Sequence, residues 1–354
     1  MKHIFHIHSQ INLLIACCVI ASRNIPKKDV LFACFRGVRG FDELGTSLSL
    51  SDEVYYHPYN SPRNLFKFKF LKNKSLISEV DTVISNFTNG DDFIYYVPHC
   101  KNPLYQVFIS NCFCKQVNYI EDGGDAYLSK EELLNKFPNK LHWSHFVSRL
   151  ILKFIPCAMN SRLKPNVNLY EDIGSNQSTS FALTNNSFST GLNENITVVN
   201  ISSDVQKRFI SDIHYESMFL FDALVEQNVI QLDQFRSFME WFVDSHSAIK
   251  SGISIKFHPA QNSKSKNIVL NVLNSRNIQY QEISSETNME LFLLSNKNKN
   301  VYGVGSSLLK YSLMKNPSQT FILFPFFTKS NDWGSIREKN WIDLFGDLSL
   351  PQVK

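Results

Sequence analysis

The stretch that decides the fold is KHIFHIHSQINLLIACCVIASRNIPKKDVLFACF, residues 2–35, near the start of the sequence. Lys2–His8 is a β-prone run, Ser9 is a typical helix N-cap, and the apolar segment Ile11–Ser22 predicts a buried helix. Asp29–Phe35 is a second β-prone run. A strand, a helix and another strand in this order predict the opening of a parallel α/β sheet.

The size and composition indicate a globular protein of two domains. Its 354 residues exceed what one hydrophobic core usually serves. The composition is 43% hydrophobic and 19% charged, which argues against a disordered chain. The net charge of +4 is too small to indicate a nucleic-acid partner, although it fits work near anionic substrates or lipid.

The first half of the chain continues the alternation of strands and helices. Gly37–Pro62 is rich in turn residues and predicts active-site or covering loops. The alternating run Leu65–Leu71 predicts a strand or an exposed amphipathic segment, with a solvated basic face rather than a binding stripe. The elements that follow are a helix at Leu76–Asn86, a strand at Asp92–Val97, a helix at Pro103–Cys112 and a strand at Gln116–Ile120. We therefore predict a Rossmann-like domain over residues 1–173.

A polar connection separates this domain from a second one. Leu141–Met159 predicts a core-facing helix with solvated Arg and Lys, and the alternative is a basic, aromatic face against a membrane. Residues 174–195 are dominated by Ser, Thr and Asn and predict a linker. The β-prone run Ile196–Ile201 and a helix at Asp204–Val225 are expected to begin the second domain.

The second domain is predicted over residues 196–330, with residues 331–354 as a tail that packs back on the domains. Its further elements are helices at Leu232–Ser245, Ser263–Asn274, Asn288–Ser295 and Ser306–Met314, and strands at Gly252–Phe257, Ile278–Glu282, Asn300–Tyr302 and Thr320–Pro325. The expected fold is therefore α/β, with two Rossmann-like domains whose parallel sheets face an interdomain cleft.

The cysteines and the first helix bear on the compartment. Seven cysteines, an odd number with several inside apolar runs, favour buried thiols in a reducing compartment. Ile11–Ala21 is far shorter than the roughly 20 residues of a membrane span, and the histidines before it make a poor signal peptide. We expect a cytoplasmic protein, with peripheral contact at the inner face of the cytoplasmic membrane left open.

Two adjacent carboxylates follow the strand Gln116–Ile120. Glu121 and Asp122 precede Gly123 and Gly124, whose backbone can adopt conformations closed to other residues. Open α/β sheets bind ligands beyond the carboxyl ends of their strands, where an acid can act as a base. An ordinary Asp-Gly-Gly turn explains the same residues, so this motif alone leaves both interpretations open.

A histidine follows a strand in the second half. His258 comes after Gly252–Phe257 and is fixed by Pro259, and strand alternation turns Lys256 to the same face. Two cations at one spot would suit an anion. The alternative is a structural histidine bonded to a loop.

A third motif opens a helix. Val301–Leu308 passes from a strand through Gly303 and Gly305 to Ser306 and Ser307. Unpaired helix N–H groups, the helix dipole and two hydroxyls would together bind a phosphate. Ordinary capping is the alternative, and the Gly-Lys-Ser/Thr ending of a nucleotide P-loop is missing.

Together the three motifs resemble those of bacterial sialyltransferases. Glu121-Asp122-Gly123, His258-Pro259 and Ser306-Ser307 match that group's acidic-acidic-Gly, His-Pro and Ser-Ser/Thr motifs in order and approximate spacing. The chain looks most like glycosyltransferase family 52, the lipooligosaccharide sialyltransferases, with the bacterial polysialyltransferases second. The resemblance implies a GT-B fold, with the acid in the N-terminal domain and the other motifs in a nucleotide-binding C-terminal domain.

The resemblance also implies a chemistry. The donor would be CMP-sialic acid or a related CMP-nonulosonate, and the acceptor a hydroxyl of a cell-surface glycan such as lipooligosaccharide or capsule. Glu121 would be the catalytic base, Asp122 would orient the loop or the acceptor, and His258 would contact and protonate the leaving phosphate. The remaining nucleotide-site residues would be Lys256, Pro259, Gly305, Ser306 and Ser307. No Asp-x-Asp motif is evident, so neither a metal nor another cofactor is expected.

Functions of two other classes stay open. A carbohydrate hydrolase would use Glu121 or Asp122 with a second carboxylate, although adjacent residues on a strand diverge and the two serines would have no role. A non-catalytic protein would bind a membrane or polyanion through Leu141–Met159. Release of CMP that requires a sugar acceptor distinguishes transfer from both.

Overall fold

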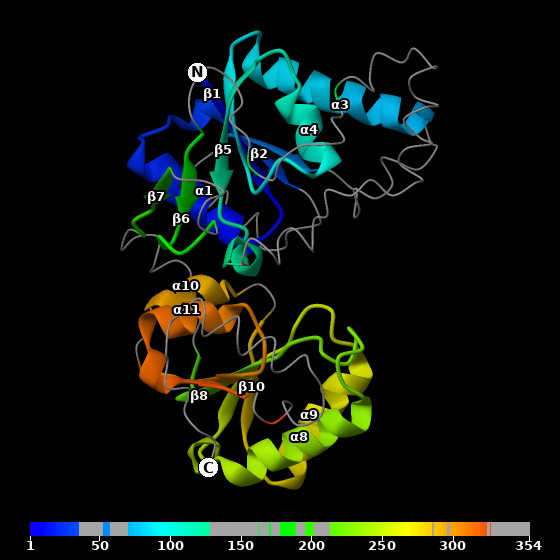
Figure 1. Cartoon of the computed structure of the whole chain (residues 1–354), viewed down its shortest axis with the longest axis vertical. Coiled ribbons are helices and arrows are strands. Elements are labelled where there is room, and N and C mark those ends of the chain that lie inside the picture. The colour runs from blue at the N-terminus through cyan, green and yellow to red at the C-terminus, as the bar shows by residue number, and fades with distance from the viewer. Residues whose placement is uncertain are drawn as a thin grey trace. The chain divides into compact units, whose positions relative to one another are not determined.

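The chain divides into two units, Met1–Ser202 and Ser203–Lys354, and each contains one β-sheet of parallel strands (Figure 1). The computed structural model describes residues 1–34, 52–56, 70–127, 162, 170, 178–188, 195–201, 213–284, 287–295, 298–323 and 326. Within these residues every strand pairs in parallel with its neighbours.

The sheet of the first unit has the strand order β3-β2-β1-β4-β5-β6-β7. These strands are β1 Lys2–Ile7, β2 Val30–Cys34, β3 Glu53–Tyr56, β4 Phe93–Val97, β5 Cys114–Ile120, β6 Ser180–Ala182 and β7 Ile196–Val198. The order runs one way from β1 to β3 and the other way from β4 to β7, so β1 and β4 flank a switch point. Ligands of open α/β sheets bind beyond the carboxyl ends of the strands at such a point.

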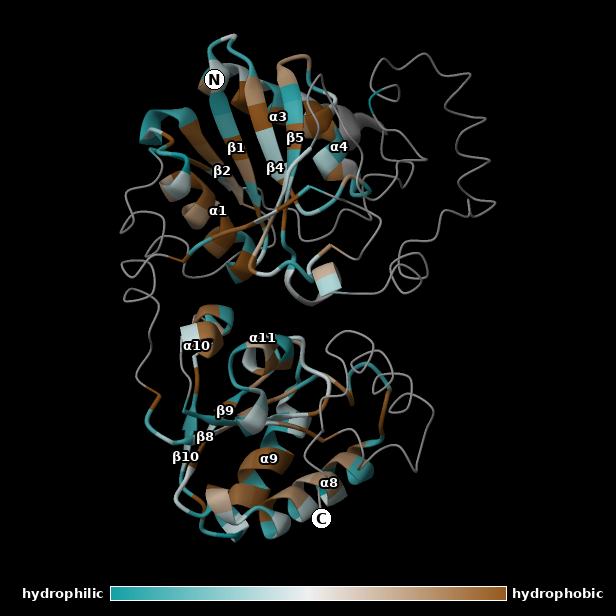
Figure 2. Ribbon diagram, turned by 60° about the vertical axis from the view of Figure 1, so that its left-hand side comes forward, coloured by the Kyte–Doolittle hydropathy of each residue, from teal (hydrophilic) through white to brown (hydrophobic). Residues whose placement is uncertain are grey.

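Helices cover both faces of this sheet (Figure 2). They are α1 Gln10–Ser22, α3 Phe70–Thr88 and α4 Pro103–Ile109, with short 3₁₀ turns η1 Lys27–Asp29 and η3 Gly123–Tyr127. Side chains of α3 and α4 pack with Ile4, Tyr95 and Val117 in one core cluster, while α1 packs on β1, β5 and β6 from the other face. Every residue from Ile11 to Ile20 is buried, so α1 is enclosed on all sides.

The sheet of the second unit has the order β10-β9-β8-β11-β12. Its strands are β8 Ser217–Leu220, β9 Ile253–Lys256, β10 Tyr280–Glu282, β11 Asn300–Gly303 and β12 Thr320–Ile322. Its helices are α8 Leu232–Ser245, α9 Ser263–Ser275, α10 Met289–Ser295 and α11 Leu308–Lys315, with 3₁₀ turns η5 Ser247–Ile249 and η6 Pro317–Gln319. The order reverses at β8, so the segments that follow β8, β9 and β11 meet at the switch point of this unit.

Packing accounts for the amphipathic helices of the second unit. In α8 the buried residues are Phe235, Phe238, Met239, Phe242 and Val243, a spacing of three and four that forms one helical face. Phe219 of the central strand β8 packs edge-on against Phe238 and Phe242. The predicted helix Leu232–Ser245 is confirmed to the residue, and the two Rossmann-like α/β units are confirmed as well.

The boundary between the units differs from the predicted one. Residues 174–195 were expected to be a linker, but they contain β6, which pairs with β5. Ile196–Ile201 was expected to open the second domain, but β7 pairs with β6 in the first sheet. Two strands of three residues each carry too little pattern to reveal which sheet they join, and their partners alone decide it.

Two strands lie where other structure was expected. The predicted loops Gly37–Pro62 contain β3, which pairs with β2 at the edge of the first sheet. The predicted helix Asp204–Val225 contains β8, the central strand of the second sheet. Leu65–Leu71 was expected to be a strand or an exposed amphipathic segment, and its described residues, 70 and 71, belong to the start of α3. The predicted helix Leu141–Met159 and the tail 331–354 lie outside the described residues.

Candidate functional site

The carboxyl ends of β1 and β5 bring together a small group of polar residues. His8 follows β1, and Glu121 and Asp122 follow β5. The strand β4 lies between β1 and β5, so the group spans the switch point of the first sheet. The sequence predicted an acid at this edge of the sheet, and the structure confirms that both carboxylates lie there.

Glu121 is enclosed in protein. Its exposed fraction is 0%, and its Oε2 accepts hydrogen bonds from the backbone N–H of Leu183 at 2.8 Å and from Ser187 Oγ at 3.0 Å. Burial first, and then the negative charge of Glu121, raises the pKa of Tyr127. A buried carboxylate with such donors fixes the segment that supplies them. Glu121 therefore ties β5 to the turn that follows β6, and its carboxylate has no exposed surface.

Asp122 lies differently. Its side chain is 19% exposed, and its Oδ1 is 2.8 Å from Nε2 of His8. The other ring nitrogen of His8, Nδ1, is 3.3 Å from the hydroxyl of Tyr105 at the start of α4. A neutral ring that donates from Nε2 to the carboxylate accepts a hydrogen bond from the Tyr105 hydroxyl at Nδ1, whereas a charged ring donates from both nitrogens. In either state His8 holds a partly exposed carboxylate in one orientation.

Asn12 supports this arrangement from α1. It is fully buried, its Nδ2 donates to the backbone carbonyl of Glu121 at 2.7 Å, and its Oδ1 accepts from the N–H of His8 at 3.5 Å. One side chain thus ties the end of β1 to the end of β5. Gly123, two residues after Glu121, has φ +62°. This left-handed conformation favours glycine and turns the chain into η3.

His258 follows β9 at the switch point of the second sheet. Its Nδ1 accepts from the N–H of Ala260 at 3.1 Å, so the proton of the neutral ring is on Nε2. The loop is closed by Gln261, whose Oε1 accepts from the N–H of His258 and whose N–H donates to the His258 carbonyl. Burial lowers the pKa of His258, and the negative charge of Glu226 opposes that shift. The exposed Pro259 lies within this closed loop.

Lys256 does not stand free beside His258. It is 9% exposed, and its Nζ donates to the carbonyl of Ser284, just beyond β10. Burial lowers the pKa of Lys256 to about 8, against the opposing charges of Glu290 and Glu282. The ammonium group of Lys256 is therefore bound to a backbone carbonyl, and the structure does not show it standing free beside His258 as the sequence predicted.

Ser306 and Ser307 follow β11, the other neighbour of β8. Ser306 is 5% exposed, whereas Ser307 is exposed and is the N-cap of α11 without a side-chain capping bond. In the described part of the chain neither hydroxyl forms a hydrogen bond. Gly303 is required by space, because a Cβ there would lie 2.9 Å from the carbonyl oxygen of Leu220 on β8. Gly305 is half-buried in the segment between Gly303 and Ser306.

Four residues around Asp122 and His258 were not predicted from the sequence: His8, Asn12, Tyr105 and Glu226. His8, Tyr105 and Glu226 come from different elements, and only the fold brings each to its partner. A signal existed for Asn12, because a lone amide in an otherwise apolar helix needs a buried partner. Among the described residues, no group of three or more His, Cys, Asp or Glu side chains is arranged to hold a metal ion. In that same part of the chain, no helix is long and apolar enough to cross a membrane.

Comparison with known proteins identifies the fold. No protein-family model and no curated protein sequence matches the chain significantly. Among solved structures, the chain is similar to a putative UDP-N-acetylglucosamine 2-epimerase from Listeria monocytogenes, with 13% identity and a TM-score of 0.53, over 99% of this chain and 89% of that one. The UDP-GlcNAc 2-epimerase from Methanocaldococcus jannaschii gives 12% identity and a TM-score of 0.50, over 98% and 93%.

Sialyltransferase structures from Photobacterium damselae are similar to the same degree. One gives 11% identity and a TM-score of 0.50, over 99% of this chain and 80% of that one. The other, described as the GT-B domain, gives 14% identity and a TM-score of 0.50, over 91% and 90%. The chain therefore has a GT-B-like fold of two parallel α/β units, as the sequence predicted.

Proposed function

We propose that the chain is an inverting, metal-independent glycosyltransferase that moves sialic acid, or a related nonulosonic acid, from a CMP-activated donor to a hydroxyl of a cell-surface glycan. The observation that carries the proposal is the partly exposed Asp122 carboxylate held by His8 at the switch point of the first sheet. A carboxylate so held is suited to take a proton from an acceptor hydroxyl. The GT-B-like fold supports the proposal, although epimerases share that fold.

Asp122, rather than Glu121, is the proposed base. A base must come within hydrogen-bond reach of the proton it takes, and Glu121 is fully buried with its Oε2 already bound by two donors. The resemblance in sequence implied the reverse assignment, with Asp122 as support. Burial is the physical reason for exchanging the two roles.

The second unit provides the groups for the leaving phosphate. The Nε2–H of His258 and the hydroxyls of Ser306 and Ser307 all lie at the carboxyl ends of strands next to β8. In the proposed step the acceptor oxygen attacks the anomeric carbon opposite the phosphate, and its proton passes to Asp122. The bond from that carbon to the phosphate oxygen breaks with its electron pair on CMP, and protonated His258 supplies a proton to the phosphate. Serine hydroxyls donate to its remaining oxygens.

A product assay tests this function. The protein is incubated with CMP-sialic acid and a galactose-terminated glycan, and the products are analysed by mass spectrometry with and without EDTA. We expect a glycan heavier by one nonulosonate, CMP release that requires the acceptor, and no loss of rate in EDTA. Growth beyond one residue would indicate a polysialyltransferase. Epimerisation of UDP-GlcNAc, or sugar hydrolysis without transfer from any of a panel of CMP-nonulosonates, would overturn the proposal.

A further inference from the structure

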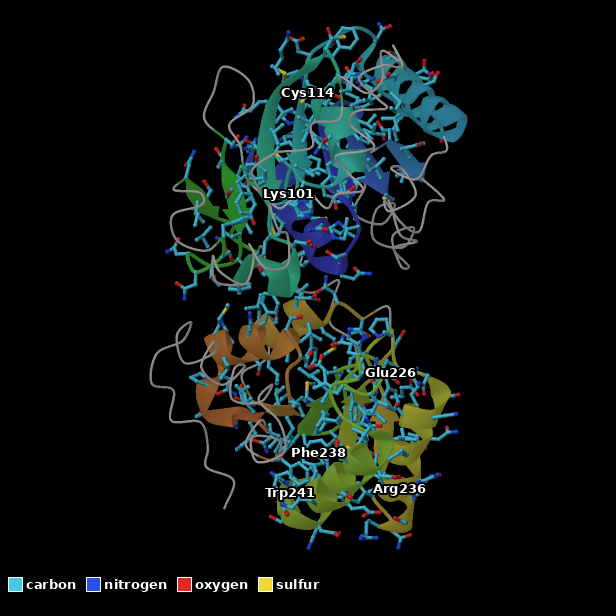
Figure 3. The ribbon with its side chains drawn as sticks, turned by 45° about the vertical axis from the view of Figure 1, so that its right-hand side comes forward. Lys101, Cys114, Glu226, Arg236, Phe238 and Trp241 are labelled. Atoms are coloured by element: carbon cyan, nitrogen blue, oxygen red, sulfur yellow. The ribbon has the colours of Figure 1, made fainter. Side chains whose placement is uncertain are left out.

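Glu226 lies between β8 and α8, beyond the carboxyl end of the central strand of the second sheet (Figure 3). Its Oε1 accepts from the N–H of Asn262 at 2.9 Å and from Ser265 Oγ at 2.7 Å. Its Oε2 is buried and has no hydrogen-bond partner among the described residues. A buried carboxylate oxygen without a hydrogen-bond donor is energetically costly, which indicates that its charge acts on a neighbouring group.

The two donors belong to the start of α9. Asn262 is the N-cap of that helix, and its Oδ1 accepts from the N–H groups of Lys264 and Ser265. A negative charge at a helix N-terminus is favourable, since the unpaired N–H groups there are the positive end of the helix dipole. Glu226 is thereby fixed against the first turn of α9.

The same helix start ends the loop that carries His258. The loop is closed at His258 and Gln261 by two hydrogen bonds, and the next residue is Asn262. Glu226 therefore holds the far end of a loop whose near end is strand β9. Loosening Glu226 would free the loop at its Asn262 end, which the two hydrogen bonds between Gln261 and His258 connect to the imidazole-bearing residue.

Charge links the same two residues. Burial lowers the pKa of His258, and Glu226 is the carboxylate that raises it again. Burial raises the pKa of Glu226, but hydrogen bonds from Asn262 and Ser265, together with the charge of His258, bring it below its usual value, so Glu226 is ionised near neutral pH. Of the lysines on β9 and α9 near His258, Lys256 donates to the Ser284 carbonyl, and Lys266 lies over the ring of Phe257 at 5.1 Å.

We infer that Glu226 positions His258, by anchoring its loop and by favouring the charged imidazole, so that a proton is available on Nε2 for a phosphate leaving group. This inference rests on the proposed function for its phosphate but not for the pairing itself. Glu226 is a positioning residue, because it acts through His258 and keeps its own charge throughout. After transfer, Asp122 releases its proton to solvent and the imidazole of His258 takes one up from solvent, which restores both groups.

The test compares Glu226→Gln with Asp244→Asn. Gln retains an acceptor for Asn262 and Ser265 but removes the charge, whereas Asp244 pairs with Arg276 on the exposed ends of α8 and α9 and controls for the loss of any one carboxylate. The imidazole of His258 is titrated with pH by NMR, and its signal is assigned as the one that disappears in His258→Gln. We expect the pH midpoint of this titration to fall in Glu226→Gln and to stay unchanged in Asp244→Asn.

Binding and rate complete the test. Calorimetry with CMP should show weaker binding by Glu226→Gln, kcat should fall about tenfold, and the basic limb of the kcat/KM profile should move to lower pH. An unchanged midpoint in Glu226→Gln would overturn the inference even if transfer is observed. If the protein neither binds CMP nor transfers, the proposed function fails, and the titration alone still supports or overturns the pairing.

A second variant covers the case in which Glu226→Gln does not fold. Ser265→Ala removes one anchor of the carboxylate but leaves its charge. We expect an unchanged titration midpoint for His258 together with a kcat about threefold lower, because this variant weakens only the anchoring of the loop. A kcat equal to that of the unaltered protein would overturn the anchoring role.

Discussion

The Nε2 atom of His8 lies 2.8 Å from Oδ1 of Asp122, although one residue follows β1 and the other follows β5. The pair bridges the end of β4, the strand between them, at the switch point of the first sheet. Tyr105 fixes the opposite side of the His8 ring at 3.3 Å. The two neighbouring carboxylates therefore lie in different environments, because Asp122 is partly exposed and Glu121 is fully buried.

Replacing Asp122 by Asn should abolish transfer with little effect on nucleotide binding. Asn has nearly the same shape but cannot take a proton, and a general base contributes about 10²–10⁴-fold to the rate. We expect kcat to fall by that factor while calorimetry gives an unchanged Kd for CMP. Asp92→Asn is the matched control, since Asp92 pairs with Lys115 on the exposed surface at 3.4 Å. A near-normal rate in Asp122→Asn would remove Asp122 from this role.

Glu121→Gln should act on stability instead. The N–H of Leu183 and the hydroxyl of Ser187 both donate to Oε2, so in the amide both lose a charged acceptor inside the protein and face either a neutral oxygen or an NH₂ group. The free energy of unfolding should fall by about 2 kcal/mol, measured by urea denaturation followed by circular dichroism. The folded fraction should lose far less activity than Asp122→Asn. Normal stability combined with an abolished rate would return the role of base to Glu121.

His8 should be replaceable in part by an amide. His8→Ala removes the donor to Asp122, and we expect a lower kcat and an altered pH profile with an unchanged Kd for CMP. Gln at this position offers an N–H group near the place of Nε2, so His8→Gln should recover part of the lost rate. Equal defects in both variants would indicate that the ring packing against Tyr105 matters more than the hydrogen bond.

The difference in burial between Glu121 and Asp122 could not be predicted from the sequence, for a physical reason. Both follow the same strand, and what distinguishes them is contact with Leu183 and Ser187, 62 and 66 positions further along. The Tyr105 partner of His8 is likewise 97 positions away. Local pattern locates the edge of the sheet and the residue types there, but burial depends on segments that only the fold brings near.

Helices and strands also differ in whether the sequence could predict them. Helix α8 was predictable because its five buried residues repeat at helical spacing over 14 residues. Strand β8 was not, because its four residues are all buried, and a short apolar run without alternation has the same pattern in a buried helix. Strands β6 and β7 have three residues each, and pairing with β5 rather than their own composition assigns them to the first sheet.

Acid should destabilise the first unit through His3. Burial, with smaller contributions from the N-terminal charge and Arg23, lowers the pKa of His3 to about 4, against an unfolded value near 6.5. Above pH 6.5 the ring is neutral in both states, whereas between pH 6.5 and 4 the unfolded chain binds the proton first and stability falls. Allowing for partial exposure, we expect a loss of about 2 kcal/mol over this window, and His3→Gln should flatten the dependence.

His258 and Ser307, the proposed phosphate-binding residues of the second unit, should differ in how their loss affects CMP binding. His258→Ala should weaken CMP binding because it removes the Nε2–H donor, and Ser307→Ala should weaken it by about 1 kcal/mol, near fivefold in Kd, because it removes a hydroxyl that has no partner in the described protein. Since burial lowers the pKa of His258, CMP binding by the unaltered protein should tighten as pH falls below 6.5, where the ring gains its charge. His258→Ala should lose that pH dependence, and Ser307→Ala should keep it. Calorimetry at several pH values separates the two, and a pH dependence that survives in His258→Ala would show that another group binds the phosphate.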